Sequence, residues 1–122
     1  MKSMFKVIVA GGRDFTDYAL LSSTLQHLLS GKKEVEIVSG VARGADSLAV
    51  KFAADSNIPV KRFPADWDNH GNSAGFKRNV EMARYADACV CFWDGKSKGT
   101  ADMIRVAKFY RLALRVIKYS KP

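Results

Sequence analysis

Apolar runs alternate along the chain with stretches in which apolar residues recur every three or four positions. Runs rich in β-branched and aromatic residues predict buried strands, and the recurring spacing predicts amphipathic helices. The strands are expected over residues 4–11, 34–40, 59–65, 87–95 and 113–120, and the helices over residues 16–31, 45–57, 75–86 and 100–112. The stretch "DWDNHGNSAG", residues 66–75, is polar without either period and predicts a loop.

The first expected helix carries capping signals at both ends. Thr16 or Asp17 suits the N-cap, because a short polar side chain accepts a hydrogen bond from a first-turn amide. Gly31 suits the end of the helix, where a left-handed backbone is common.

Strand–helix alternation with nearly continuous apolar strands predicts an α/β protein with a Rossmann-like, doubly wound, three-layer fold. Right-handed crossovers would build a mostly parallel five-stranded sheet in an order near 3-2-1-4-5. The chain of 122 residues is long enough to bury a core without disulfides, and we expect one domain over residues 1–122. In such sheets ligands bind at the carboxyl ends of the strands.

The formal net charge of +8 favours polyanionic partners such as nucleic acids, nucleotides or phosphate-bearing metabolites. Most of the lysines are expected on the solvated surface. Arg105, Lys108 and Arg111 recur at helical spacing and predict an exposed basic stripe, with nucleic acid as a weak partner.

No apolar run approaches the roughly 20 residues of a membrane span. The apolar part of the N-terminal stretch is about six residues long and ends in Gly-Gly-Arg-Asp, which predicts a strand rather than a signal peptide. We therefore expect a cytoplasmic protein that does not contact a membrane.

Cys89 and Cys91 are one residue apart in an expected strand and so point to the same face of the sheet. They are too close in sequence for an ordinary disulfide. We expect small apolar core residues here, and neither a metal site nor a cofactor, because both histidines lie elsewhere in the sequence.

Three glycine-rich stretches follow expected strands: "GGRDFTD" (11–17), "SGVARGAD" (39–46) and "WDGKSKGT" (93–100). In the expected strand order they would lie side by side at one edge of the sheet. Their convergence predicts a site for an anion, built from backbone amides and a few cations. A Walker A loop is excluded, because the glycine that "GKS" would require five residues earlier is Val90.

In the first stretch, Gly11 and Gly12 would let backbone amides approach an anion, and Arg13 offers a planar donor for phosphate or carboxylate. Alternatively, the glycines only form a turn and Asp14 caps the helix that follows.

In the second stretch, Ser39 and Gly40 end the strand, and Gly44 opens a helix whose first turn presents amides to an anion. Arg43 either adds charge to this site or pairs with Asp46.

In the third stretch, Gly99 and Thr100 lie at another helix start, where Thr100 is either the N-cap or a phosphate ligand. Four carboxylates near these stretches are either structural or open to a reaction, and these are Asp14, Asp46, Asp66 and Asp94.

Four motifs in this order resemble the YspA-type branch of the SLOG superfamily: "GGRDF", "SGVARGAD", "PADW" followed by "GNSAGFKRNVEM", and "FWDGKSKGTADMI". The superfamily is named for the DNA-processing Smf proteins and the cytokinin-activating LOG enzymes, and the resemblance extends over about residues 5–118. It implies a Rossmann-like domain with a pocket for a nucleotide or nucleotide-derived small molecule, formed by Gly11–Arg13, Ser39–Asp46 and Gly99–Thr100.

Members of these families are variously enzymes, ligand sensors and single-stranded-DNA binders, and the resemblance allows for a homo-oligomer. We expect this domain to bind a nucleotide-related ligand, to sense or to process it, through backbone amides, Arg13, Arg43 and Arg78. The alternatives are a LOG-like N-glycosidase or phosphoribohydrolase that acts on nucleoside monophosphates, and an Smf-like DNA-binding protein.

The sequence departs from the LOG pattern at one residue. LOG enzymes share the motif Gly-Gly-x-Gly-Thr-x-x-Glu, whose glutamate assists N-glycosidic cleavage. Gly99 and Thr100 match this motif, but Met103 stands where the glutamate would fall. Asp102 comes one position early, which is about 100° around a helix. We therefore expect no hydrolysis of nucleoside monophosphates at LOG-like rates.

Trp67 and His70 lie in the expected loop 66–75, where Trp67 either stacks on a base or fastens the loop as an apolar plug. Arg78 and Asn79 follow at the start of the next helix, within expected reach of a phosphate or of ribose hydroxyls. Arg78 is also the counterpart of the upstream arginine in LOG active sites.

Overall fold

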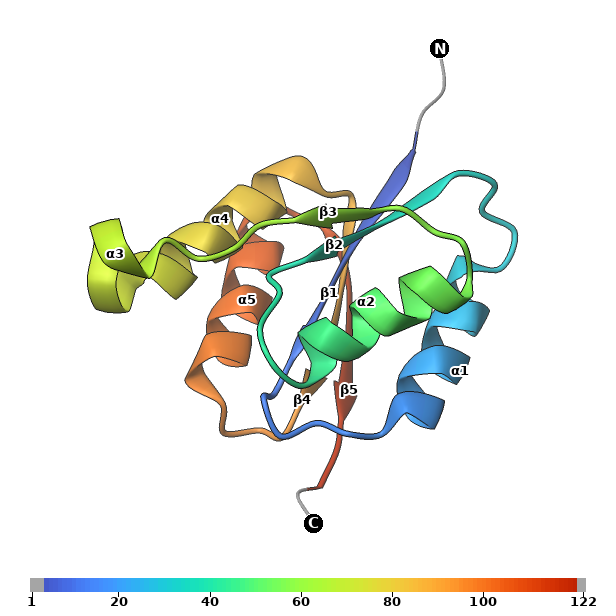
Figure 1. Ribbon diagram of the computed structural model, residues 1–122, viewed down its shortest axis with the longest axis horizontal. Coiled ribbons are helices and arrows are strands. Elements are labelled where there is room, and N and C mark those ends of the chain that lie inside the picture. Colours follow the sequence, from blue (N-terminus) through green and yellow to red (C-terminus); the bar gives the residue numbers. More distant parts are fainter. Residues whose placement is uncertain (1–3, 121–122) are drawn as a thin grey trace.

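The computed structural model describes residues 4–120, which form a β-sheet with helices on both faces (Figure 1). The strands are β1 (Phe5–Gly11), β2 (Val35–Ser39), β3 (Val60–Arg62), β4 (Ala88–Trp93) and β5 (Ala113–Lys118). The helices are α1 (Tyr18–Leu29), α2 (Ala45–Asp55), α3 (Trp67–His70), α4 (Ala74–Tyr85) and α5 (Lys98–Phe109), and the 3-10 turn η1 (Gly71–Ser73) joins α3 to α4.

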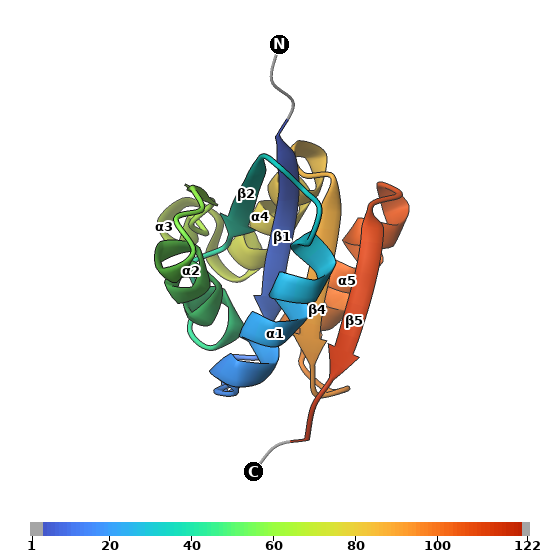
Figure 2. The same cartoon turned by 90° about the vertical axis from the view of Figure 1, so that its right-hand side faces the viewer.

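The sheet has the order β3-β2-β1-β4-β5, and each of its four strand pairs is parallel. Helices α1 and α2 cover one face and α4 and α5 cover the other, as the two views in Figures 1 and 2 show. This arrangement confirms the predicted α/β, Rossmann-like fold and its strand order. Within residues 4–120, no helix has the length and apolar character needed to cross a membrane.

The core consists of two apolar clusters, one on each face of the sheet. Alternate residues of a strand point to opposite faces, so β1 supplies Val7 and Val9 to the cluster under α1 and α2, and Ile8 and Ala10 to the cluster under α4 and α5. Strands that are buried on both faces must be apolar at successive positions. This requirement explains the nearly continuous apolar runs in the sequence.

Cys89 and Cys91 are buried free thiols in the cluster beneath α4 and α5. Their sulfur atoms lie 3.5 Å apart, on the same face of β4. Both cysteines are thus core residues, as predicted.

The predicted N-cap is confirmed for α1 and is wrong for α5. Asp17 is the N-cap of α1, and its Oδ1 accepts a hydrogen bond from the amide of Leu20 at 3.0 Å. Helix α5 begins at Lys98, two residues earlier than predicted, because Ser97 is its N-cap. The N-cap role weighed for Thr100 is therefore wrong.

The stretch predicted as a loop, 66–75, contains α3 and η1. Asp66 caps α3, because its carboxylate accepts hydrogen bonds from the main-chain amide and the side-chain amide of Asn69. These bonds, the side-chain one first, hold the pKa of Asp66 below its ordinary value. A helix of four residues is too short to show a helical period, so the hydrophobic pattern could not reveal it.

We predict that Phe15 is a principal contributor to stability. Phe15 lies in the loop that follows β1, and its buried ring stacks on Phe92 at a centroid distance of 4.8 Å and meets the edge of Tyr119 at 4.8 Å. Phe15→Ala should lower the free energy of unfolding by about 3–5 kcal/mol in urea denaturation. Phe109→Ala is the matched control, since Phe109 is 75% exposed and its loss should change stability by less than about 0.5 kcal/mol. Equal effects of the two substitutions would contradict this assignment.

Candidate functional site

A pocket of about 560 Å³ opens at the carboxyl edge of the sheet, beyond the ends of β1 and β4. Among the predicted site residues, those that line it are Gly11, Gly12, Arg13, Asp14, Asp46, Arg78, Asn79, Asp94, Gly99 and Thr100. Ser39, Gly40, Arg43 and Gly44 do not line it. The first and third glycine-rich stretches thus face the cavity, and the second contributes mainly through Asp46.

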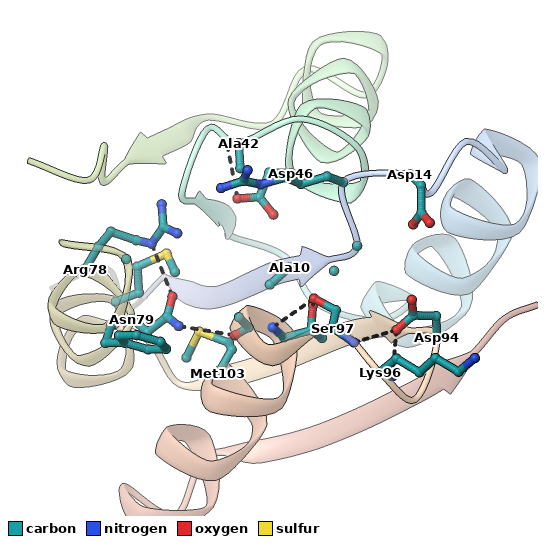
Figure 3. A pocket seen from close by; sticks show the side chains of 18 of the residues that line it. Ala10, Asp14, Ala42, Asp46, Arg78, Asn79, Asp94, Lys96, Ser97 and Met103 are labelled. Atoms are coloured by element: carbon teal, nitrogen blue, oxygen red, sulfur yellow. Dashed lines mark hydrogen bonds between the residues drawn. The ribbon is translucent and has the colours of Figure 1, made fainter. Parts of the chain in front are cut away.

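The pocket is elongated (Figure 3). Arg78, Asn79 and Met103 lie toward one end, where α4 and α5 approach each other, and Asp14, Asp94 and Lys96 lie toward the other. Ala10, Asp46 and Ser97 lie between the two ends.

The β1–α1 loop packs directly on the start of α2. The carbonyl oxygen of Gly12 accepts hydrogen bonds from the amides of Phe15 and Ala45, both at 3.2 Å. Gly44 has a φ of +77°, and a Cβ atom there would lie 2.1 Å from the Gly12 oxygen. The first amide of α2 was predicted to bind an anion. It is instead hydrogen-bonded to the loop after β1.

Ser39 and Gly40 support the pocket from behind. The hydroxyl of Ser39 is buried, donates to the carbonyl oxygen of Asp46 at 3.4 Å and accepts from the amide of Val41 at 3.0 Å. The carbonyl oxygen of Gly40 accepts from Nη1 of Arg78 at 2.7 Å. A Cβ atom at Gly40 would lie 2.4 Å from that nitrogen, so any other residue there would displace the guanidinium.

Asp46 is the buried charge of the site, with 4% of its surface exposed. Its carboxylate accepts a hydrogen bond from the amide of Ala42 at 3.3 Å. Burial raises the pKa of Asp46 to about 6, and the Ala42 bond and the positive charges of Arg78 and Arg13 limit this rise. Arg43 is exposed, and the charges that act on Asp46 are those of Arg78 and Arg13.

Arg78 connects α4 to the loop after β2, and Asn79 connects α4 to helix α5. Arg78 Nε donates to Oδ1 of Asn79 at 3.2 Å, and burial lowers the pKa of the guanidinium although Asp46 opposes this effect. The side-chain amide of Asn79 donates to the carbonyl oxygen of Gly99 at 3.4 Å and to Oδ2 of Asp102 at 3.0 Å. Asp102 also pairs with Arg105 at 2.8 Å and does not line the pocket.

The β4–α5 loop is organised by Asp94. Its Oδ1 accepts hydrogen bonds from the amides of Lys96 and Ser97, both at 2.8 Å. Ser97 then caps α5, and its hydroxyl lies 3.2 Å from the buried hydroxyl of Thr100. This loop therefore presents the first turn of α5 to the pocket, where amides lack partners within the helix.

Asp14 does not cap α1, because Asp17 takes that position. Instead, Oδ1 of Asp14 accepts a hydrogen bond from the hydroxyl of Tyr119 at 2.6 Å. Burial, this bond and the negative charges of Asp14 and Asp94 raise the pKa of Tyr119. The bond ties the end of β5 to the wall of the pocket.

Several lining residues were not predicted, and three of them, Gly75, Phe76 and Met82, belong to α4. Gly75, Arg78, Asn79 and Met82 follow the spacing i, i+3, i+4, i+7, which is the signal that could have identified this face of α4. The residues that lie outside the predicted pocket-forming ranges are Ala10, Asn72, Gly75, Phe76, Met82, Lys96 and Ser97.

Trp67 and Met103, which the sequence analysis discussed without assigning them to the site, also line the pocket. Trp67 is 51% exposed and Met103 is buried, and both face the cavity. Across residues 4–120, no group of three or more histidine, cysteine or acidic side chains is placed to hold a metal ion.

We predict that Asp46 makes stability depend on pH. Its folded-state pKa of about 6 exceeds the ordinary value of 3.8, so between pH 4 and 6 the folded state retains a proton that the unfolded state has lost. The free energy of unfolding should therefore fall as pH rises through this window, relative to Asp46→Asn, by at most about 3 kcal/mol, and stay level above it. Urea denaturation of both proteins from pH 4 to 8 measures the difference.

Asp55→Asn is the control for this experiment. Asp55 is exposed, and its hydrogen bond to Lys51 holds its pKa below the ordinary value, so its substitution should leave the window between pH 4 and 6 unchanged. Parallel curves for wild type and Asp46→Asn across the whole range would contradict the prediction.

Comparison with known proteins places the chain in a family. The family model of the YspA, cpYpsA-related SLOG family matches residues 5–70. The gene 61 protein of Mycobacterium phage D29 is 35% identical over 112 residues, which cover 86% of this chain and 90% of that protein. No solved structure matches the chain significantly. The family match and the phage relative, together with the Rossmann-like sheet, show that this protein belongs to the YspA, cpYpsA-related SLOG family.

Proposed function

We propose that the pocket binds a nucleotide or a nucleotide-derived small molecule. The observation that carries this proposal is the convergence of the β1–α1 loop, the β4–α5 loop and the start of α4 on one cavity of about 560 Å³. That volume falls within the range usual for pockets that bind small molecules. Membership of the SLOG family is consistent with a nucleotide-related ligand.

The phosphate-binding part of the proposal rests on α5 and on cations. Gly99 and Thr100 lie in the first turn of α5 and line the pocket, and the positive end of the helix dipole favours an anion there. Arg13, Arg78 and Lys96 also line the pocket and can neutralise a phosphate.

The same lining carries three carboxylates, which are Asp14, Asp46 and Asp94. Carboxylates accept hydrogen bonds from hydroxyl groups and repel phosphate. A ligand with sugar hydroxyls as well as a phosphate satisfies both kinds of group. A polyphosphate without a sugar would leave the carboxylates facing like charge.

We predict that Arg13 contributes to ligand affinity and that Arg43 does not. The two arginines are both exposed and lie in adjacent loops, but only Arg13 lines the pocket. Arg13→Ala should weaken the binding of AMP, or of whichever nucleoside monophosphate binds best, about tenfold, the size expected for one charge-assisted hydrogen bond. Arg43→Ala should bind like wild type. Isothermal titration calorimetry at about 0.15 M salt compares the three proteins.

The opposite pattern, with affinity lost in Arg43→Ala and kept in Arg13→Ala, would contradict the role given to the β1–α1 loop. Absence of binding by all nucleoside monophosphates and by ADP-ribose would overturn the proposed function itself.

We also predict that the protein releases no free base from nucleoside monophosphates at LOG-like rates. Met103, which stands at the motif position of the LOG glutamate, lines the pocket, whereas Asp102 bonds to Asn79 and Arg105 and does not line it. Incubation with AMP followed by chromatography for adenine measures this. Rapid adenine release would refute the prediction, and Asp14→Asn, Asp46→Asn and Asp94→Asn would then identify the carboxylate responsible.

A further inference from the structure

We infer that Trp67, whose ring lies close to Gly75, and the adjacent Phe76 form a seat for the aromatic base of the ligand at the α4 end of the pocket. This inference rests on the proposed function and adds that the base of the ligand determines which compounds the pocket prefers. The seat makes the site selective for compounds that carry a base over sugar phosphates that carry none.

The first observation is that two large aromatic side chains are exposed inside a concave site. Trp67 is 51% exposed and Phe76 is 46% exposed, and both line the pocket. Exposure of apolar rings to water is unfavourable, and a flat ring that covers them would recover this cost. An apolar plug, the other role weighed for Trp67, would be buried in the core, and Trp67 is not.

The second observation is that the segment carrying Trp67 is held in place. Asp66 caps α3 through Asn69, and the hydroxyl of Ser73 donates to the carbonyl oxygen of His70 at 2.8 Å. Lys77 of α4 lies 3.2 Å from Nδ1 of His70. These bonds keep α3 against α4 and position the indole at the rim of the pocket before any ligand arrives.

The third observation is the space around Gly75. A methyl group at this position would lie 3.6 Å from Cη2 of Trp67 and 4.0 Å from Nη2 of Arg78. The glycine therefore leaves a gap that borders both the indole and the guanidinium. A base beside this gap would contact the indole and lie next to the guanidinium.

Buried apolar residues also line the pocket. Ala10, Met82 and Met103 line the pocket with apolar surface, and thioethers make favourable contacts with aromatic rings. The carboxylates of Asp14 and Asp94 lie toward the opposite end (Figure 3). The α4 end of the pocket therefore suits a base, whereas the carboxylates suit the sugar hydroxyls, and the first turn of α5 and Lys96 suit the phosphate.

The experiment compares ligands that differ only in the base. AMP, GMP, CMP, UMP and ribose 5-phosphate are titrated into the wild-type protein by calorimetry. Stacking on an aromatic side chain strengthens binding roughly 5- to 150-fold per base. At least one nucleotide should therefore bind at least about fivefold more tightly than ribose 5-phosphate.

Trp67→Ala and Phe76→Ala test the seat, with Phe109→Ala as a matched control. Phe109 is an exposed phenylalanine of α5 that does not line the pocket. Each seat variant should lose about fivefold or more in affinity for the nucleotide and change little for ribose 5-phosphate, whereas the control should match wild type. Thermal unfolding without ligand confirms that each variant is folded.

Gly75→Ala tests whether a loss of nucleotide affinity can occur without a loss of protein stability. Alanine fits the helical backbone of α4 at ordinary contact distances, so the substitution should raise the melting temperature by about 2–4 °C. The added methyl group occupies the gap, so nucleotide affinity should fall at least about fivefold. A purely structural role for Gly75 would not lower affinity in a protein that is more stable.

Two results would overturn the seat and leave the proposed function intact. One is equal affinity for ribose 5-phosphate and for all four nucleotides. The other is unchanged nucleotide affinity in Trp67→Ala, Phe76→Ala and Gly75→Ala. Failure of all five compounds to bind would instead remove the proposed function, and the seat with it.

Discussion

The pocket depends on a contact between two backbones, the carbonyl of Gly12 and the first amide of α2, that of Ala45. The approach is so close that Gly44 has no room for a side chain. Through this contact the loop after β1 is fixed to the loop after β2, which sets Arg13 near the buried Asp46. A shift of either loop would separate the cation from the carboxylate and widen the cavity between them.

A second connection crosses from one helical layer to the other. Arg78 belongs to α4, on one face of the sheet, and donates to the carbonyl oxygen of Gly40, which follows β2. The guanidinium also lies near Asp46 of α2, on the opposite face. Because a buried carboxylate is costly without a cation, the packing of α4 and the charge of α2 support each other. The wall of the pocket is therefore also part of the framework of the fold.

The fold was predictable because its signals are local and repeated: buried parallel strands such as 88–93 are apolar at every position. The site was predictable in part, since Gly11–Arg13 and Gly99–Thr100 follow strands that end at one edge. The supporting role of Gly40 was not, because it depends on Arg78, 38 residues away in sequence. Helix α3 was missed for the opposite reason, since four residues capped by Asp66 carry no period.

The parallel pairing of β1 with β4 has a consequence for folding. In that pairing Gly11 lies opposite Phe92. The residues that line the pocket span the sequence from Ala10 to Met103 and come together only once this register has formed. Contacts between segments so distant in sequence form late and slowly, because a long loop must close first. A partly folded chain therefore has no binding site, and any molecule that occupies the pocket stabilises the entire sheet by mass action. Ligand affinity and global unfolding are thermodynamically one coupled equilibrium in this domain.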